Sequence, residues 1–245
     1  MKPAIEQTGQ IQISVVVPVY NEEENLPVLI AKIVEVFKEI GLPYEMIFVD
    51  DGSSDGSLKV LKEAASRYPL LRIIKLKQNQ GLSTALLAGM REARGEKIVT
   101  LDADLQNDPG DIPRLLGCLD QYDMATGWRQ KREDPWLKKV SSKIANAIRN
   151  RLSGEEIKDS ACTLRVFKRE CVQNIPVFNG MHRFLSTLVK MEGYRIIEVP
   201  VIHHPRKFGK SKYNIRNRMV QAFVDLLVVR WMKDRRIRYE IEERV

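Results

Sequence analysis

The sequence lacks several features that would assign it to a common class of protein. Its three cysteines, Cys118, Cys162 and Cys171, contain no C-x-x-C pair, so they predict neither a disulfide framework nor a zinc site. The first ten residues have no basic segment followed by an apolar core, and we expect no secretory signal there. No apolar run reaches the roughly 18 residues of a membrane-spanning helix. These absences favour a cytoplasmic protein.

What is present is typical of a folded α/β protein. The 245 residues are 44% hydrophobic and 29% charged, enough for one domain with a sizeable core. The net charge of +8 indicates an acidic partner, which could be nucleic acid, an anionic membrane surface or a phosphorylated small molecule. Most of the excess charge lies in the second half, in residues 129–151 and 206–238.

The first half alternates short apolar runs with segments of helical spacing. Strands are predicted at residues 13–19, 44–50, 71–76, 96–102 and 122–127. Helices are predicted at residues 26–40, 58–65 and 82–94. This order predicts an α/β fold with a doubly wound, mostly parallel, Rossmann-like sheet and helices on both faces.

The second half is more basic and less regular. Helices are expected at residues 140–152, 181–192 and 215–235, and strands at 163–167 and 194–201. The helices at 140–152 and 215–235 are amphipathic. We expect residues 1–214 to form the main domain, and residues 215–245 a basic helical extension of the same structural unit.

Acidic and turn-forming residues follow three of the predicted strands: PVYNEEEN, DDGSSDGS and DADLQND. Ligands of open parallel sheets bind at the carboxyl ends of the strands, so these segments should meet in one crevice. Asp102, Asp104 and Gln106 would point the same way if the strand alternation continues through them. Their oxygen atoms suit Mg²⁺ or Mn²⁺, and the alternative is a solvated acidic turn.

The other two segments allow more than one interpretation. In DDGSSDGS, Asp55 can simply cap a helix, or a carboxylate can accept hydrogen bonds from a nucleotide base or ribose. In PVYNEE, Asn25 can cap the next helix, and Tyr20 can stack on a base.

Together, four motifs resemble the GT-A domain of family 2 glycosyltransferases. They are VVPVYNE (16–22), VDDGSSD (49–55), NQG (79–81) and DADLQ (102–106). More narrowly, the chain resembles the polyprenyl-phosphate hexosyltransferases, the group that contains dolichol-phosphate mannose synthase. The resemblance covers about residues 12–215.

The resemblance implies a role for particular residues. The base and ribose pocket would be lined by Pro18, Tyr20, Glu22, Val49 and Asp51. The metal would be held by Asp102, Asp104 and Gln106, with Ala103 also at the donor. The phosphates of donor and acceptor would be surrounded by Arg129, Lys138, Ser142 and Arg206, which with Asp104 form the expected catalytic set.

A further segment and two departures complete the comparison with the family. Asp159 and Arg165 match the D-x-x-x-x-x-R segment of the group. Thr163 stands where many members have glycine, and Lys138 where the mannose synthase type has arginine. Lysine is a point charge rather than a bidentate fork, which alters the phosphate geometry expected there.

The resemblance implies an inverting transfer of a hexose from GDP-mannose or UDP-glucose to dolichyl or undecaprenyl phosphate. An N-acetylhexosamine or a modified pentose is a further alternative for the sugar. The lipid acceptor implies peripheral attachment to the cytoplasmic face of a membrane through residues 140–152 and 215–232. A membrane-protein partner or a homo-oligomer could supply part of that attachment.

Three rival functions fit the sequence less well. A family 2 enzyme acting on a sugar hydroxyl would carry an acidic base motif and Q-x-x-R-W, which the second half does not contain. A nucleic-acid-binding protein does not explain the acidic strand ends, so no nucleic-acid partner is expected. A dinucleotide-dependent oxidoreductase would have G-x-G-x-x-G after the first strand, where PVYNEEEN stands instead.

Overall fold

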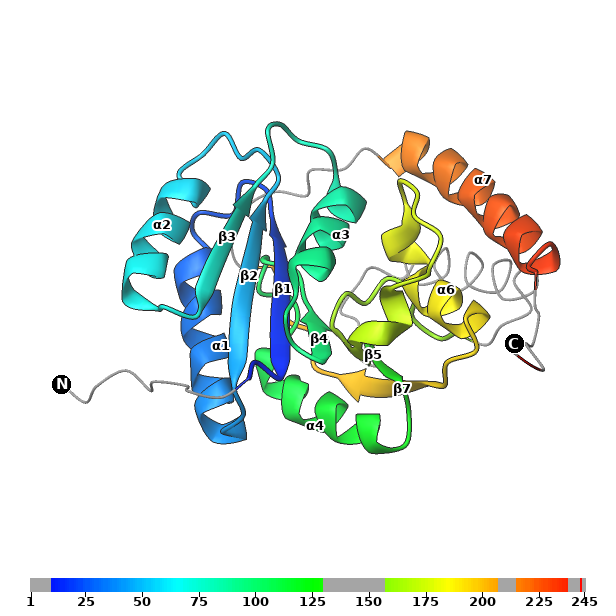
Figure 1. Ribbon diagram of the computed structural model, residues 1–245. Coiled ribbons are helices and arrows are strands. Elements are labelled where there is room, and N and C mark those ends of the chain that lie inside the picture. The colour runs from blue at the N-terminus through cyan, green and yellow to red at the C-terminus, as the bar shows by residue number, and fades with distance from the viewer. Residues whose placement is uncertain (1–9, 130–156, 207–214, 238–242, 244–245) are drawn as a thin grey trace.

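The computed structural model describes residues 10–129, 157–206, 215–237 and 243, and the side chains of 215–220 are outside the description. Seven strands of these residues form one sheet in the order β3-β2-β1-β4-β6-β5-β7 (Figure 1). The strands are β1 (Ile13–Val19), β2 (Tyr44–Asp50), β3 (Leu71–Lys75), β4 (Lys97–Thr100), β5 (Met124–Arg129), β6 (Arg165–Lys168) and β7 (Ile196–Val201).

The sheet is parallel except for one strand. β1 pairs in parallel with β2 and β4, β2 with β3, and β5 with β7. β6 lies between β4 and β5 and is antiparallel to both. The carboxyl ends of six strands and the start of β6 therefore lie at the same edge.

Helices cover both faces of the sheet. They are α1 (Leu26–Ile40), α2 (Ser57–Arg67), α3 (Leu82–Glu92), α4 (Ile112–Gly117), α6 (Leu185–Met191) and α7 (Ile215–Asp234). Short 3₁₀ turns are η1 (Pro109–Asp111), η2 (Cys118–Asp120), η3 (Arg169–Val172) and η4 (Met181–Arg183). The predicted doubly wound α/β fold is confirmed.

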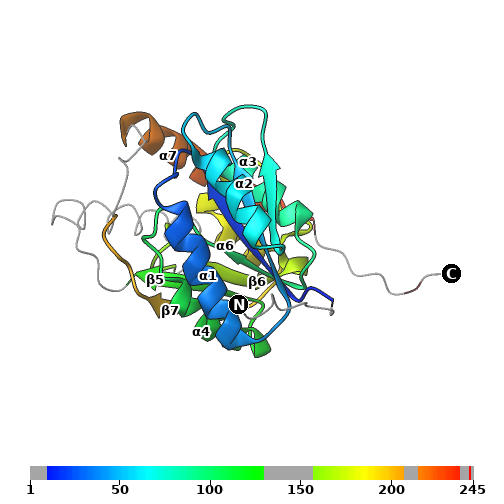
Figure 2. The same ribbon diagram turned by 90° about the vertical axis from the view of Figure 1, so that its left-hand side faces the viewer.

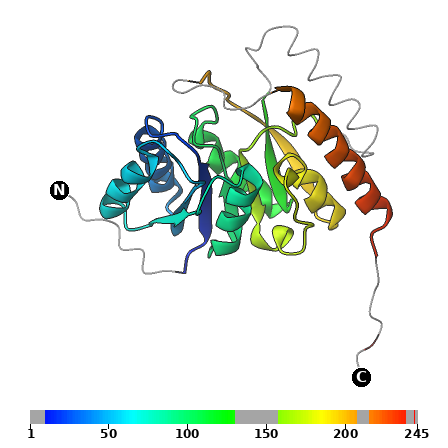
Figure 3. The same ribbon diagram turned by 90° about the horizontal axis from the view of Figure 1, so that it is seen from above.

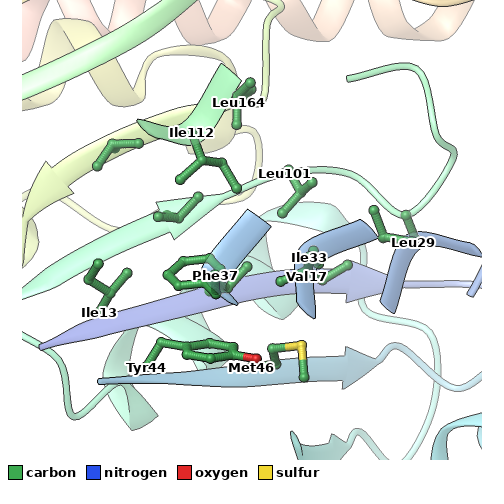
Figure 4. Close-up of a cluster of buried hydrophobic side chains, with 14 of the residues drawn as sticks. Ile13, Val17, Leu29, Ile33, Phe37, Tyr44, Met46, Leu101, Ile112 and Leu164 are labelled. Atoms are coloured by element: carbon green, nitrogen blue, oxygen red, sulfur yellow. The ribbon is translucent and has the colours of Figure 1, made fainter. Parts of the chain in front are cut away.

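One hydrophobic core lies under α1, α2 and α4. Figure 2 shows α1 and α2 in front of the sheet on this side. The rings of Phe37 from α1 and Tyr44 from β2 stack with their centroids 4.2 Å apart (Figure 4). Every residue of β1 and β2 is buried, because helices cover the sheet on both sides.

A second core lies under α3, α6 and α7 on the opposite face. Gly89 of α3 packs against β1 and β2 so closely that a Cβ atom there would lie 2.3 Å from Cγ1 of Val16. The glycine thus allows α3 to approach the two central strands.

Helix α7 lies at the end of the molecule away from α1 and α2 (Figure 3). Leu226 and Val229 are buried in the second core, so part of α7 belongs to the same hydrophobic unit. Arg183 pairs with Asp225 of α7 at 3.6 Å. The division at residues 214 and 215 remains a prediction. Each helix in the described part of the chain is too short or too polar to span a bilayer.

The predicted elements differ from the observed ones mainly at their ends. β1, β2 and α1 begin and end at the predicted residues, whereas the strand predicted at 96–102 is shorter and ends at Thr100. The helix predicted at 181–192 is divided into η4 and α6. Helix α4 was not predicted, and the predicted helix at 140–152 lies outside the described residues.

Candidate active site

The loops after β1 and β2 are joined side by side at the carboxyl edge. The amide of Asn21 donates to Ser53 Oγ at 3.0 Å, and Asn21 Oδ1 accepts from the amide of Ser54 at 2.7 Å. The amide of Glu22 donates to Ser57 Oγ at 2.8 Å. These contacts fix the predicted nucleotide-binding segments relative to one another.

Asp51 holds the start of α3. Its Oδ1 accepts from the amide of Gln80 at 2.7 Å, and its Oδ2 accepts from the amide of Gly81 at 2.8 Å. The neighbouring Gly52 has φ +69°, and a Cβ there would lie 2.6 Å from the backbone nitrogen of Asn79. The VDDG and NQG motifs are thus joined by hydrogen bonds. Asp51 has this structural role independently of any contact with a nucleotide.

The predicted base and ribose residues differ in their exposure. Tyr20 is 36% exposed, so its ring can be reached by a ligand. Pro18 and Val49 are buried within the sheet, and Val49 lies beside the backbone of Gly89 in α3. Direct nucleotide contacts by these two residues remain predictions. Since the side chain of Val49 packs on α3, a nucleotide contact by Val49 would be made through its backbone.

The acidic segment is a turn rather than a strand end. β4 ends at Thr100, so the strand alternation from which we expected aligned side chains does not reach Asp102. Leu105 has φ +59°, in the left-handed region, and the amide of Gln106 donates to Asp104 Oδ1 at 3.2 Å. Ala103, the fourth predicted residue here, is buried.

The two carboxylates of this turn interact. Burial, and next the charge of Asp104, raise the pKa of Asp102 to about 6. A hydrogen bond with Thr163 and the charges of Arg165 and Arg129 act in the opposite direction. The turn therefore carries concentrated negative charge that a cation would stabilise.

The donor set fits a divalent cation that completes its coordination with other ligands. Among the described residues, no group of three His, Cys, Asp or Glu side chains could form an all-protein metal site. Asp102 and Asp104 are two carboxylates, and Gln106 adds an amide oxygen. Mg²⁺ is commonly bound in proteins by one or two carboxylates together with substrate phosphates and water.

The segment after β7 lies alongside the acidic turn and brings Arg206 to it. His203 forms a β-bridge with Asn107, and the amide of His204 donates to the carbonyl oxygen of Gln106 at 2.8 Å. Arg206 Nη2 lies 2.6 Å from Asp104 Oδ2. Its Nη1 lies 3.8 Å from Oε1 of Glu22. The loops after β1, β4 and β7 therefore meet at one guanidinium.

A second arginine lies at the end of β5. Arg129 Nε and Nη2 donate to the two carboxylate oxygens of Asp159 at 2.6 and 2.9 Å. Asp159 is 4% exposed, and its backbone amide donates to Glu198 of β7 at 3.0 Å. Asp159 and Glu198 thus orient the guanidinium of Arg129.

Arg165 begins β6 beside this group. It is 1% exposed, and its Nη2 donates to the carbonyl oxygen of Ser160 at 3.1 Å. Burial lowers the pKa of Arg165, while the charges of Asp102 and Asp159 oppose that effect. Its buried charge supplements that of Arg129 behind the acidic turn.

The structure brings together much of the predicted site. Arg206 pairs with both Glu22 and Asp104, and Arg129 and Arg165 interact electrostatically with Asp102. Lys138 and Ser142 lie outside the described residues, so their placement remains a prediction.

Two supporting contacts were not predicted. His204 Nε2 lies 2.8 Å from Oδ2 of Asp108, and Glu198 holds the backbone of residues 158 and 159. Each joins segments about 40 or more residues apart, so no local sequence pattern indicates either contact.

The sequence model described as glycosyl transferase family 2 matches residues 14–175. The chain belongs to this family. The match includes the PVYNEE, VDDG and DADLQ segments and extends through β6, so the predicted resemblance to family 2 is confirmed. The family 2 chain is accordingly a glycosyltransferase.

A curated relative gives the narrower comparison. The chain is 39% identical over 219 residues to an undecaprenyl-phosphate 4-deoxy-4-formamido-L-arabinose transferase of Proteus mirabilis. The alignment covers 88% of this chain and 67% of the relative. The family 2 chain thus spans about two thirds of that protein's length.

Two solved structures share the fold. A mannosyltransferase from Pyrobaculum calidifontis, in complex with GDP-Man and Mn²⁺, has a TM-score of 0.64 and 23% identity, covering 89% of this chain and 64% of its own. Glucosyl-3-phosphoglycerate synthase from Mycobacterium tuberculosis, with Mn²⁺, UDP and phosphoglyceric acid, has a TM-score of 0.69 and 19% identity, covering 92% and 78%. At these identities the likeness concerns the fold, and it confirms the GT-A architecture.

Proposed function

We propose that this chain transfers a sugar from a nucleotide-diphosphate sugar to a polyprenyl phosphate, with inversion at the anomeric carbon. The observation that carries the proposal is the meeting of the acidic turn with Arg206 and Arg129 at one edge of the sheet. The relative acting on undecaprenyl phosphate supports the choice of acceptor.

The donor would lie across the loops after β1, β2 and β4. Asp102, Asp104 and Gln106 would hold Mg²⁺ or Mn²⁺, which would offset the charge of the departing nucleoside diphosphate. Pro18, Tyr20, Glu22, Val49 and Asp51 would surround the base and ribose, and Ala103 would contact the donor through its backbone. Mn²⁺ in the two structural neighbours is consistent with this assignment.

The acceptor would approach from the basic side. Arg129, fixed by Asp159, and Arg206 would bind the phosphates of donor and acceptor, with Lys138 and Ser142 completing the set. A phosphate monoester has a second pKa of about 6, so its oxygen is largely ionised at neutral pH. The attacking atom then needs no general base.

The sugar is a separate question. Mannose from a guanosine donor and glucose from a uridine donor are the sugars we expect from the resemblance. The formamido-arabinose of the curated relative favours the modified pentose among the alternatives.

Attachment to the cytoplasmic surface of a membrane would bring the enzyme to its lipid acceptor. Five apolar side chains of α7 form an exposed stripe, with Trp231 62% exposed: Phe223, Val224, Leu227, Val228 and Trp231. Arg230 lies on the same helix and is 49% exposed at its side chain. Apolar insertion together with cationic contacts to headgroups is the usual mode of interfacial helices.

Vesicle flotation tests the attachment. We expect the protein to float with anionic vesicles at low salt, and Leu227→Glu with Trp231→Glu to reduce the floated fraction. A matched change on an exposed lysine of α1, Lys38→Glu, controls for net charge. Equal flotation of all three proteins would contradict the assignment of the α7 stripe as the membrane-binding surface. Flotation only with a membrane-protein partner or as a homo-oligomer would assign the attachment to that partner or oligomer instead.

A two-stage assay tests the function. Nucleotide sugars are first screened for shifts in melting temperature with and without Mn²⁺, because a ligand of the folded state raises stability. The best donor is then incubated with undecaprenyl phosphate, and the lipid product is measured. Asp104→Asn should abolish the Mn²⁺-dependent shift. Transfer to a glycan hydroxyl without any lipid product would favour the alternative family 2 activity.

A further inference from the structure

Arg206 lies against one of the residues expected to bind the metal. Its Nη2 is 2.6 Å from Oδ2 of Asp104, and its Nη1 is 3.8 Å from Oε1 of Glu22. We propose that Arg206 is an internal counterion of the acidic turn, which a divalent cation must displace from Asp104 before the guanidinium can turn to substrate phosphate. This inference rests on the metal site of the proposed function.

The acidic turn needs such a counterion. Asp104 is 7% exposed and interacts with the charge of Asp102. A buried carboxylate is costly unless it is paired and hydrogen-bonded. Arg165 and Arg129 offset the charge of Asp102, whereas within the described part of the chain Asp104 forms its ion pair with Arg206.

Arg206 is placed so that it can exchange partners. Among the residues up to 206 that the structure describes, the last backbone hydrogen bond between its segment and the acidic turn is made by His204, two residues earlier. The side chain of Arg206 is 28% exposed, in contrast to the buried Arg165. A long side chain that is anchored two residues away and partly solvated can leave one oxygen ligand for another without unfolding the segment that carries it.

This arrangement predicts opposite effects on two ligands. Removing Arg206 should strengthen binding of the metal alone, because the guanidinium no longer competes with the metal for Asp104. The same change should weaken binding of a nucleoside diphosphate, because a phosphate contact is lost. A residue that only stabilises the loop would weaken both.

The test is Mn²⁺ binding to the full chain without nucleotide, measured by calorimetry and by the free Mn²⁺ electron paramagnetic resonance signal. Arg206→Gln should lower the Kd by about 5- to 150-fold, the range of a typical coupling between two ligands. Arg206→Lys, which keeps the charge, should stay close to wild type. Arg195→Gln removes a mostly exposed arginine and serves as the matched control, with a Kd within about twofold of wild type.

The second measurement is the affinity for GDP and UDP at saturating Mn²⁺. Arg206→Gln should weaken the better of the two nucleotides while it strengthens Mn²⁺ binding. An unchanged or weaker Mn²⁺ affinity in a folded Arg206→Gln, or no Mn²⁺ binding by either protein, overturns the inference. If wild type transfers sugar but Arg206→Gln does not bind Mn²⁺ more tightly, the counterion role is rejected and the proposed function stands. If Arg206→Gln binds Mn²⁺ more tightly but neither protein binds a nucleotide, the proposed function is rejected and the counterion role stands.

Discussion

Replacing Asp51 by asparagine tests whether this residue holds the nucleotide-binding loops together before any ligand is bound. Its two carboxylate oxygens accept from the amides of Gln80 and Gly81 at 2.7 and 2.8 Å. Asparagine has one acceptor oxygen, so one amide would face the donor group of the new side chain. The start of α3 should therefore lose one hydrogen bond and the charge that strengthens the other.

The size of the effect follows from these contacts. Leaving a buried donor without a partner costs about 1–3 kcal/mol. Asp51 is 3% exposed but Gln80 is exposed, so water can reach part of the site and the lower half of that range is expected. In a chain of this length each kcal/mol corresponds to about 2–4 °C in Tm, which gives a decrease of about 2–8 °C.

Thermal unfolding without nucleotide or metal measures the effect. Asp120→Asn makes the same chemical change at an exposed carboxylate and should leave Tm within about 1 °C of wild type. If Asp51→Asn unfolds at the same temperature as Asp120→Asn, Asp51 does not hold the loops in the free protein, and its role would be confined to ligand contact.

Two further predictions concern stability. Gly89→Ala should be less stable than Gly117→Ala by about 1–3 kcal/mol in urea unfolding, because only the first places a Cβ against Val16 while both gain helix propensity; equal midpoints would contradict the close packing of α3. Burial alone raises the pKa of Asp123, but hydrogen bonds, first that from Lys168 at 2.7 Å, lower it below the usual 3.8. The contribution of Asp123 to the free energy of unfolding should therefore be complete above about pH 4 and lost below. The difference in this free energy between wild type and Asp123→Asn should be smaller at pH 3 than at pH 7.

The central strands and α1 could be predicted from sequence because their signals are local. Residues 13–19 and 44–50 are apolar runs of strand length, and Gly41 at φ +70° ends α1 where its apolar spacing stops. Helix α4 escaped prediction because it has only six residues, too few for a helical period to be recognised. Its apolar residues Ile112, Leu115 and Leu116 were the available signal.

The candidate site was predictable in its composition more than in its contacts. Asp102 and Asp104 were found because an acidic pair follows an apolar run, although the reasoning from strand alternation failed when β4 ended at Thr100. The contact of Arg206 with Asp104 spans 102 residues, and that of Arg129 with Asp159 spans 30. Such pairs depend on strand order and direction, which a single sequence does not specify.

The antiparallel direction of β6 explains how the buried guanidinium of Arg165 comes to lie beside the acidic turn. If β6 ran parallel to β4, its first residue would lie at the opposite edge of the sheet, far from the acidic turn. Because it runs antiparallel, Arg165 is opposite Thr100, the last residue of β4, and Thr126 within β5, near the edge of the sheet that carries the loops. Thr100 Oγ1 also donates to the carbonyl oxygen of Thr163 at 2.8 Å, which fixes the segment before β6 beside β4. Arg165 reaches the acidic turn because β6 runs in this direction. Arg165→Met should therefore remove a charge that lowers the pKa of Asp102. The distant contacts between the loops after β1 and β2 should stay in place.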